Sequence, residues 1–328
     1  MDKISYLIIL MLAVASCSVV DSIANPTTSP PMSTLPDITT ATTTPPRPAP
    51  TMPEPMPAGL CESFAEPVAV GTVAIDEVVE ASGIAVSRQY PETIWMHNDS
   101  GGGPVVYATS LDGTNLGRFE LDVPAFDWED MAIGPGPDPG NDYLYLGDIG
   151  DNLQFRPAVT VHRIPEPLPD PAGGTVVDVV SFSLVYPEPG FDSEAMIVDP
   201  ITGDILLVTK GDAGEPAQIY RAPAADLVDG GLTRLEQVGT FNLEAGAFVT
   251  AADIDPTGAA LIFRGYNQVW LWARTDLEFT ETFAAEPCRT PSTAEVQGEA
   301  IAFAQQGFSY LTVSEGRNPD INLVASDS

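Results

Sequence analysis

A two-strand unit recurs five times along this chain and begins each time at a residue with a side-chain oxygen. The five first residues are Ser82, Glu129, Glu194, Thr250 and Glu299. Each opens an apolar run, which is followed by a turn and by a second apolar run that ends in polar residues. Successive copies begin roughly 50–65 residues apart, and repeats of about 40–50 residues with about four short strands each are typical of a β-propeller. The sequence therefore predicts an all-β, five-bladed β-propeller, with six blades as the alternative.

Further alternating runs within the copies predict the outer strands of each blade. They span residues 106–110, 116–121, 159–164, 176–185, 218–221, 235–241, 268–272 and 278–283. The fifth copy is one strand short, because the chain ends soon after residues 321–325. We therefore expect residues 67–75 to supply its outer strand. Strands from both termini then close the ring, which leaves no free sheet edge.

The first 59 residues do not have the composition of a folded domain. Residues 4–14 form an apolar run that is too short to span a bilayer and is typical of a signal peptide. The small residues before Cys17 resemble a bacterial lipobox, in which the cysteine becomes the lipidated first residue of the mature chain. An ordinary signal peptidase site near Ala15 is the alternative.

These observations predict three segments. Residues 1–16 are a lipoprotein signal peptide, residues 17–59 are a disordered tether rich in proline and threonine, and residues 60–328 are the β-propeller domain. The protein is then exported and anchored by lipid at Cys17 on the extracytoplasmic side of a bacterial membrane.

The charge balance excludes one class of partner. The chain has 46 acidic residues against 13 lysines and arginines, for a formal net charge of −33 at pH 7. A surface this acidic repels nucleic acid, and the sequence contains no basic run that would offset the repulsion. We expect a monomer that binds no nucleic acid, contacts the membrane through its lipid, and recognises an unidentified small molecule or protein.

Two cysteines remain once Cys17 is assigned to the lipid. Cys61 lies where the tether meets the first strand, and Cys288 lies just before the fifth copy. A closed ring brings these places together, so an oxidising compartment favours a Cys61–Cys288 disulfide over two separate thiols.

The repeated oxygen-bearing position predicts a metal site. The innermost strand of each propeller blade lines the central tunnel, so Ser82, Glu129, Glu194, Thr250 and Glu299 are expected to form one ring. Three carboxylates in a partly dry channel repel one another unless a cation or protons neutralise them. Carboxylate and hydroxyl oxygens suit Ca²⁺, which takes about 6–8 oxygen ligands. The alternative is that the glutamates bond backbone N–H groups or arginines and bind no metal.

This ring resembles the tunnel calcium site of the calcium-activated nucleotidases, or soluble apyrases, which are five-bladed propellers that hydrolyse nucleoside di- and triphosphates. The correspondence covers residues 82–315 and does not extend to the base- and phosphate-contacting residues of that family. Residues 95–100, 127–133, 143–152 and 297–302 resemble more closely a group of secreted bacterial propeller proteins of unassigned activity. The resemblance implies a propeller fold and a calcium site rather than a catalytic activity.

The ends of the second strands offer a second candidate site. Their polar residues are expected to gather at one mouth of the tunnel, where Lys210 and Arg264 are candidates to bind phosphate and Asp99 or Asp148 to orient a water molecule. An ordinary solvated rim has the same composition. Two functions follow: a tethered, calcium-binding propeller that recognises a ligand, or a calcium-dependent hydrolase of phosphate esters or anhydrides.

Overall fold

A computed structural model describes residues 50–188, 190–211, 215–244 and 246–327. The chain divides into two units, Met1–Pro48 and Ala49–Ser328, and the described residues all belong to the second. The lipidation candidate Cys17 and most of the expected tether lie outside the described residues. Within them, no helix is long and apolar enough to cross a bilayer.

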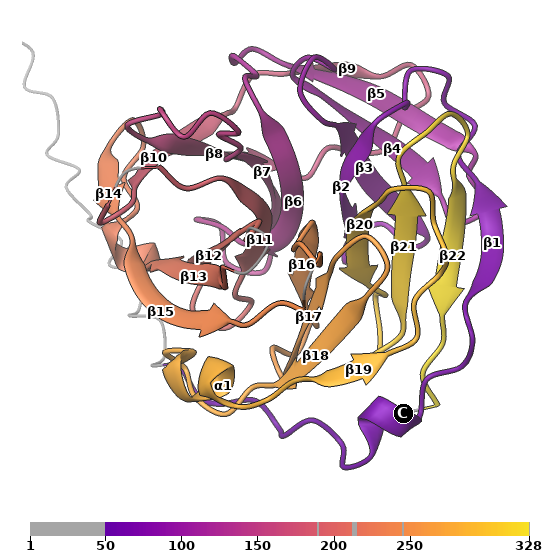
Figure 1. Cartoon of the computed structure of the whole chain (residues 1–328). Coiled ribbons are helices and arrows are strands. Elements are labelled where there is room, and N and C mark those ends of the chain that lie inside the picture. The colour runs from indigo at the N-terminus through magenta and orange to yellow at the C-terminus, as the bar shows by residue number, and fades with distance from the viewer. Residues whose placement is uncertain (1–49, 189, 212–214, 245, 328) are drawn as a thin grey trace, which may run out of the picture. The chain divides into compact units, whose positions relative to one another are not determined.

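Five β-sheets surround one centre, which confirms the five-bladed propeller and excludes the six-bladed alternative (Figure 1). Blade 1 contains β2 (Ala81–Val86), β3 (Thr93–Asn98), β4 (Val105–Ser110), β5 (Asn115–Leu121) and β9 (Gly174–Val176). Blade 2 contains β6 (Trp128–Pro135), β7 (Asp142–Asp148), β8 (Val159–Pro165), β10 (Val180–Val185) and β14 (Leu232–Arg234). Blade 3 contains β11 (Ser193–Val198), β12 (Ile205–Thr209), β13 (Ala217–Ala222) and β15 (Glu236–Phe241). Blade 4 contains β16 (Ala251–Ile254), β17 (Ala260–Arg264), β18 (Val269–Ala273) and β19 (Cys288–Thr290). Blade 5 contains β20 (Gly298–Phe303), β21 (Tyr310–Ser314), β22 (Asp320–Val324) and β1 (Val68–Thr72).

Strands from both ends of the described chain close blade 5, as the sequence predicts. β1 pairs antiparallel with β22, so that Val68 lies opposite Leu323. The Cys61–Cys288 disulfide is also confirmed and joins two Cα atoms 6.2 Å apart. Cys61 lies in the short 3-10 helix η1 (Leu60–Glu62), next to the segment that leads into β1. The disulfide therefore ties the start of the propeller to blade 4.

Two short strands cross from one blade to another. β9 follows blade 2's strand β8 in the sequence but pairs parallel with β5 of blade 1. β14 comes from the segment after β13 of blade 3 but pairs parallel with β10 of blade 2. The run 176–185, predicted as a single strand, is therefore divided between β9 and β10. Each crossing covers the outer edge of the preceding blade.

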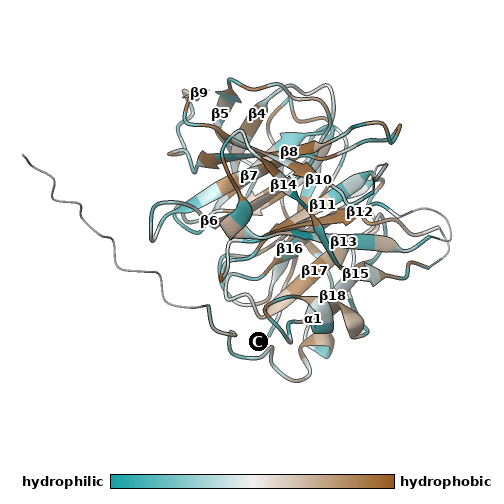
Figure 2. Cartoon of the chain, turned by 90° about the vertical axis from the view of Figure 1, so that its left-hand side faces the viewer, coloured by the Kyte–Doolittle hydropathy of each residue, from teal (hydrophilic) through white to brown (hydrophobic). Residues whose placement is uncertain are grey.

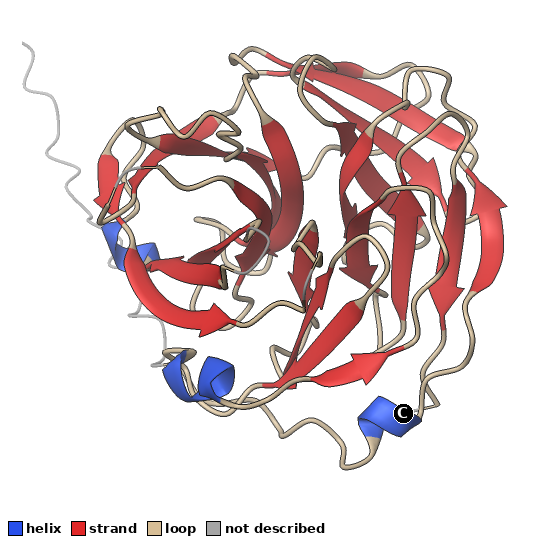
Figure 3. Ribbon diagram, viewed as in Figure 1, coloured by secondary structure: helices blue, strands red, loops and turns tan. Residues whose placement is uncertain are grey.

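One predicted strand is wrong. Residues 278–283 do not form the outer strand of blade 4, because α1 (Thr280–Ala284) occupies this segment and β19 takes the outer position. The carboxylate of Asp276 accepts from the backbone N–H of Thr282 at 2.9 Å and from that of Glu281 at 3.2 Å, which stabilises the first turn of the helix. The helices are short blue segments among red strands and tan loops (Figure 3).

Hydrophobic contacts between neighbouring blades form the core. Trp95 of blade 1 and Trp128 of blade 2 belong to one such cluster and are almost fully buried. All six residues of β11 are buried, because the strand lies between β6 and β16 and is covered on both faces. The strands carry most of the brown, hydrophobic colouring in Figure 2. This packing holds the inner strands rigidly around the axis.

Candidate metal centre

The five ring residues lie on or next to the innermost strand of each blade. Ser82 is in β2, Glu129 in β6, Glu194 in β11 and Glu299 in β20, whereas Thr250 immediately precedes β16. These inner strands contact one another in a closed circle. The repeat therefore brings one oxygen-bearing residue from each blade to the axis.

The two hydroxyl groups of the ring are already hydrogen-bonded to neighbouring blades. Ser82 Oγ donates to the backbone oxygen of Glu129. Thr250 Oγ1 donates to the backbone oxygen of Gly298 at 2.8 Å. Ser82 thus links blade 1 to blade 2, and Thr250 links blade 4 to blade 5.

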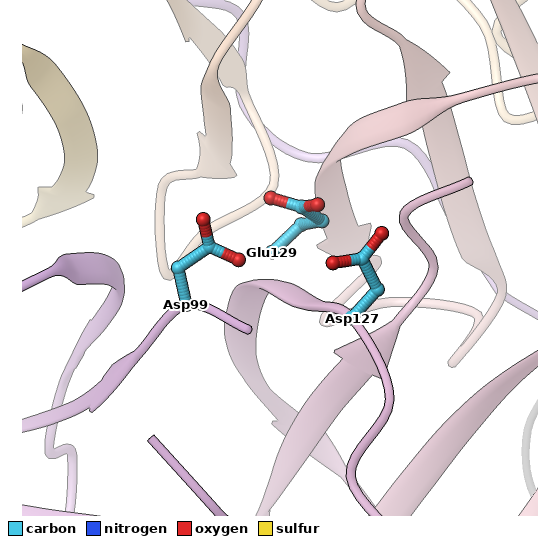
Figure 4. A group of neighbouring side chains, drawn as sticks. All are labelled: Asp99, Asp127 and Glu129. Carbon is cyan, nitrogen blue, oxygen red and sulfur yellow. The ribbon is translucent and has the colours of Figure 1, made fainter. Parts of the chain in front are cut away.

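A carboxylate cluster lies on one side of the ring, and it consists of Asp99, Asp127, Glu129, Asp192 and Glu194. Carboxylate oxygens of Asp99, Asp127 and Glu129 lie within 4.8 Å of one another and face a common point (Figure 4). Oxygens of Glu129, Asp192 and Glu194 meet the same limit. Glu129 therefore belongs to both groups and lies at the centre of the cluster.

The backbone at the start of each inner strand positions these side chains. Asp127 and Glu129 are two residues apart where β6 begins, and Asp192 and Glu194 are two residues apart where β11 begins. The pairing register shifts between Trp128 and Asp130 and between Ser193 and Ala195, so each glutamate lies where the strand pairing is irregular. Asp99 directly follows β3, and its N–H donates to Glu80 O at 2.8 Å.

Sequence reasoning missed Asp127 and Asp192 as site residues. The sequence contains a signal for them, because Phe-Asp-x-Glu occurs at residues 126–129 and again at 191–194. Both copies lead into an inner strand. The five-fold repeat includes the glutamate but not the aspartate, because only these two copies carry it.

Glu129 is the most constrained member of the cluster. Glu129 is only 3% exposed. Within the described residues, no N–H or O–H group donates a hydrogen bond to its carboxylate. Burial raises its pKa well above the ordinary value, and the negative charges of Glu194, Asp99, Asp127 and Asp192 raise it further. A proton or a cation would therefore stabilise this largely buried carboxylate among its negative neighbours.

Gly150 leaves room for this crowding. A Cβ atom at Gly150 would overlap the carboxylates of Glu129 and Asp127. The N–H of Gly150 donates to the backbone oxygen of Asp127 at 3.2 Å. The absence of a side chain at this position therefore permits the close approach of the loop after β7 to the cluster.

Lys210 is the cation nearest to the cluster. Its Nζ lies 2.5 Å from Glu194 Oε1. Burial raises the pKa of Glu194 to about 7, although the charge of Lys210 acts in the opposite direction. Burial alone would lower the pKa of Lys210, but Glu194 raises it above its ordinary value. Lys210 therefore stays charged and offsets one of the five carboxylates.

Glu299 lies outside both close groups of carboxylates. It accepts a hydrogen bond from Gln297 Nε2 at 3.1 Å. Burial raises its pKa to about 8, and the charges of Glu194 and Glu315 act in the same direction. Glu299 therefore stays outside the cluster, and below pH 8 burial favours its protonated, neutral form.

Two of the four predicted catalytic residues support the fold instead of facing solvent. Asp148 is 1% exposed, pairs with Arg156 at 2.7 Å and accepts from the N–H of Phe126 at 2.9 Å. Arg264 is fully buried, pairs with Glu295 at 2.6 Å and donates to Ala300 O at 2.8 Å. The Arg264 side chain is therefore enclosed and already paired, so it does not offer the free cation that the sequence predicted at the mouth.

A recess of about 380 Å³ adjoins the cluster. Its wall includes Asp192 and Lys210 of the site, together with Gln154, Phe191, Glu215 and Phe248. Aromatic rings, carboxylates and amides thus surround one opening. The recess has the size of a small-ligand site.

Comparison with known proteins assigns this chain to no family. No family model matches the chain. No curated protein matches it either. Raptor from Chaetomium thermophilum aligns with a TM-score of 0.38 and 10% identity over 77% of this chain and 20% of its own. A structure of the mitotic checkpoint complex aligns with a TM-score of 0.37 and 13% identity over 73% of this chain and 62% of its own. The chain thus spans less than two thirds of either protein, and the propeller assignment depends on the strand order described above.

Proposed function

We propose that this protein is a calcium-binding β-propeller that recognises a ligand or partner at the mouth of its tunnel. The observation that carries the proposal is Glu129, a buried carboxylate that receives no hydrogen bond from a described residue and is surrounded by four other carboxylates. A cation in the carboxylate cluster would replace mutual repulsion by attraction.

The donor set favours calcium. All five residues of the cluster offer carboxylate oxygens, and no cysteine or histidine joins them among the described residues. Oxygen-only sets of high charge suit hard cations, and Ca²⁺ accepts the irregular geometry and the larger ligand number that five side chains provide. Mg²⁺ prefers stricter octahedral geometry and usually keeps several waters.

The cluster differs from the ring that the repeat predicts. Ser82 and Thr250 donate to backbone oxygens, and Glu299 is hydrogen-bonded to Gln297. We therefore assign Asp99, Asp127, Glu129, Asp192 and Glu194 to the ion, and we assign the other three ring residues to the support of the tunnel.

Calorimetric titration of calcium into chelator-treated full-length protein tests the proposal. Glu129→Gln keeps the shape of the side chain but removes its charge, so we expect calcium affinity to fall by about 100-fold or more, which is about 2.7 kcal/mol. Glu299→Gln is the matched control, because it makes the same chemical change on another inner strand, β20, outside the cluster. Equal effects of the two substitutions, or no calcium binding by the wild type, would refute the proposed site.

The calcium-dependent phosphohydrolase remains the second candidate. Lys210 lines the recess and lies beside the cluster, as a group that binds a phosphate would. Its charge is already paired with Glu194, and Arg264 is buried, so the mouth offers less positive charge than the sequence suggested. Release of phosphate from nucleotides, phytate or simple esters, dependent on calcium and lost in Lys210→Met, would establish this function.

Export and lipid anchoring complete the proposal. The lipobox-like residues before Cys17 and the tether composition of residues 17–59 support a position on the outer side of a bacterial membrane. The propeller would then lie in the medium outside that membrane.

A further inference from the structure

Three largely exposed apolar side chains gather beside the carboxylate cluster. Phe126 is 69% exposed, Leu153 is 80% exposed and Phe155 is 73% exposed. Phe126 directly precedes Asp127 of the cluster, whereas Leu153 and Phe155 belong to the loop after β7. Exposed aromatic groups that lie together usually mark an interaction surface, unlike single exposed side chains.

Hydrogen bonds and one charged side chain hold the two segments side by side. The N–H of Phe126 donates to Asp148 Oδ2 at 2.9 Å, and that of Gly150 donates to Asp127 O at 3.2 Å. The Arg156 guanidinium carbon lies 5.9 Å from the centre of the Phe126 ring. The carboxylate of Asp151 accepts from the N–H groups of Phe155 and Arg156, at 3.0 Å and 2.7 Å. The loop therefore has a defined shape that presents its apolar side chains to solvent.

The loop that carries Leu153 and Phe155 borders the recess. Gln154, between Leu153 and Phe155, lines the recess of about 380 Å³ together with Phe191, Asp192, Glu215 and Phe248. The two nearby cations are already paired, Lys210 with Glu194 at 2.5 Å and Arg156 with Asp148 at 2.7 Å. The surface therefore combines apolar groups with an excess of negative charge.

We propose that Phe126, Leu153, Phe155 and the adjoining recess form a docking surface for a protein segment that presents a lysine or arginine between apolar residues. The cationic group enters the recess, where Asp192 and Glu215 supply negative charge and Phe191 and Phe248 supply aromatic surface. The apolar neighbours pack against Phe126, Leu153 and Phe155. A second copy of this chain is disfavoured, because the net charge of −33 makes two copies repel each other.

The proposal goes beyond calcium binding and does not depend on it. With all five cluster carboxylates ionised, Lys210 charged and one Ca²⁺ bound, the site retains a charge of about −2 from the count of its groups. A cationic segment is therefore attracted with or without the ion.

Selection of a random dodecapeptide phage library on the full chain tests the proposal without a presumed sequence. We expect enriched peptides to carry lysine or arginine next to leucine, isoleucine, phenylalanine or tryptophan. An enriched peptide, labelled and measured by fluorescence anisotropy, should bind at least about tenfold more weakly to the triple variant Phe126→Ser, Leu153→Ser, Phe155→Ser. It should bind about threefold more weakly to Glu215→Gln, with a reduced dependence on salt.

The matched control changes three other exposed apolar residues, Val177→Ser, Val228→Ser and Leu232→Ser, which are 77%, 61% and 70% exposed. This control should bind the peptide within about twofold of the wild type. Absence of enrichment, enrichment of acidic peptides, or equal binding by the first triple variant would overturn the proposal. A second test uses the Cys17→Ser chain and neutral phosphatidylcholine vesicles. If this chain binds the vesicles and the first triple variant abolishes that binding, the patch inserts into a bilayer and the proposal is overturned.

Discussion

Lys210 Nζ lies 2.5 Å from Glu194 Oε1, and this is the one ion pair that the described residues form with a carboxylate of the five-membered cluster. The pair is only partly protected from water, since the Lys210 side chain is 27% exposed and that of Glu194 is 6% exposed. The charge of Lys210 thus neutralises part of the negative charge of the cluster, and a bound divalent cation would neutralise more of it.

Lys210→Met removes this compensation. Without calcium, the melting temperature should fall, because Glu194 is left buried beside other carboxylates. With calcium in excess, the melting temperature should return close to that of the wild type, because the ion binds only the folded cluster. Thermal denaturation with and without chelator measures both effects, and Lys210→Arg is the control that keeps the charge. A variant that calcium does not rescue would contradict this assignment.

The metal-free protein should lose stability as pH rises. Burial raises the pKa of Glu194 to about 7 and that of Glu299 to about 8. The unfolded chain releases these protons near a pKa of about 4.3, so between that pH and about 8 the folded state holds more protons than the unfolded state. The free energy of unfolding therefore falls across this window. Urea denaturation at several pH values measures how the free energy of unfolding changes with pH, and calcium should reduce this change. A free energy of unfolding that rises with pH in chelator would contradict the raised pKa values of the buried carboxyl groups.

Calcium affinity should show the opposite trend, because the ion competes with protons for the same oxygens. We expect tighter binding at pH 8 than at pH 6, with protons released on binding. Calorimetry in two buffers of different ionisation enthalpy counts these protons. A calcium affinity that is constant between pH 6 and pH 8 would place the ion away from the carboxylates whose pKa is raised.

Gly150→Ala should disrupt the cluster from outside it. The added Cβ would overlap the carboxylates of Glu129 and Asp127, so we expect calcium affinity to fall by at least about tenfold. Gly174→Ala is the matched control, because its added Cβ has only an ordinary contact with Phe119 at 3.9 Å. Calcium titration of the two variants, with circular dichroism to verify the fold, distinguishes a local effect from unfolding.

The Cys61–Cys288 disulfide should stabilise the closed ring. The two cysteines are separated by 227 residues, for which the chain-entropy relation gives an upper figure of about 5 kcal/mol. The double variant Cys61→Ser, Cys288→Ser should therefore melt at a lower temperature than the wild type, and a reductant should destabilise only the wild type. A double variant as stable as the wild type would show that the pairing of β1 with β22 closes the ring unaided.

Lipid anchoring can be tested on residues outside the described part of the chain. Labelled fatty acid should enter the wild type but not Cys17→Ser, and this variant should appear in the soluble fraction. Ser18→Ala is a neighbouring control that should remain anchored. Membrane retention of Cys17→Ser would support another form of attachment.

Local sequence pattern predicts much of this fold, because strand alternation and repeated turns act over a few residues. The inner strands β2, β6, β11, β16 and β20 follow directly from the repeat, and the closure by β1 follows from the missing fifth outer strand. Pairing of Cys61 with Cys288 follows from that closure. The positions of Glu129 and Glu194 near the axis follow from the same periodicity.

Long-range contacts decided the rest. The pairing of β9 with β5 and of β14 with β10 joins segments from different blades, and neither hydropathy nor spacing encodes that choice. Arg264 has the same position in its repeat as residues expected at the mouth, but Glu295 and the backbone of blade 5 hold it inside. Asp99, Asp127 and Asp192 come from three blades and meet around Glu129 only when the ring closes. The sequence by itself determined which strands face the axis, whereas the tertiary structure determined which carboxylates share one point, because that depends on distances between blades.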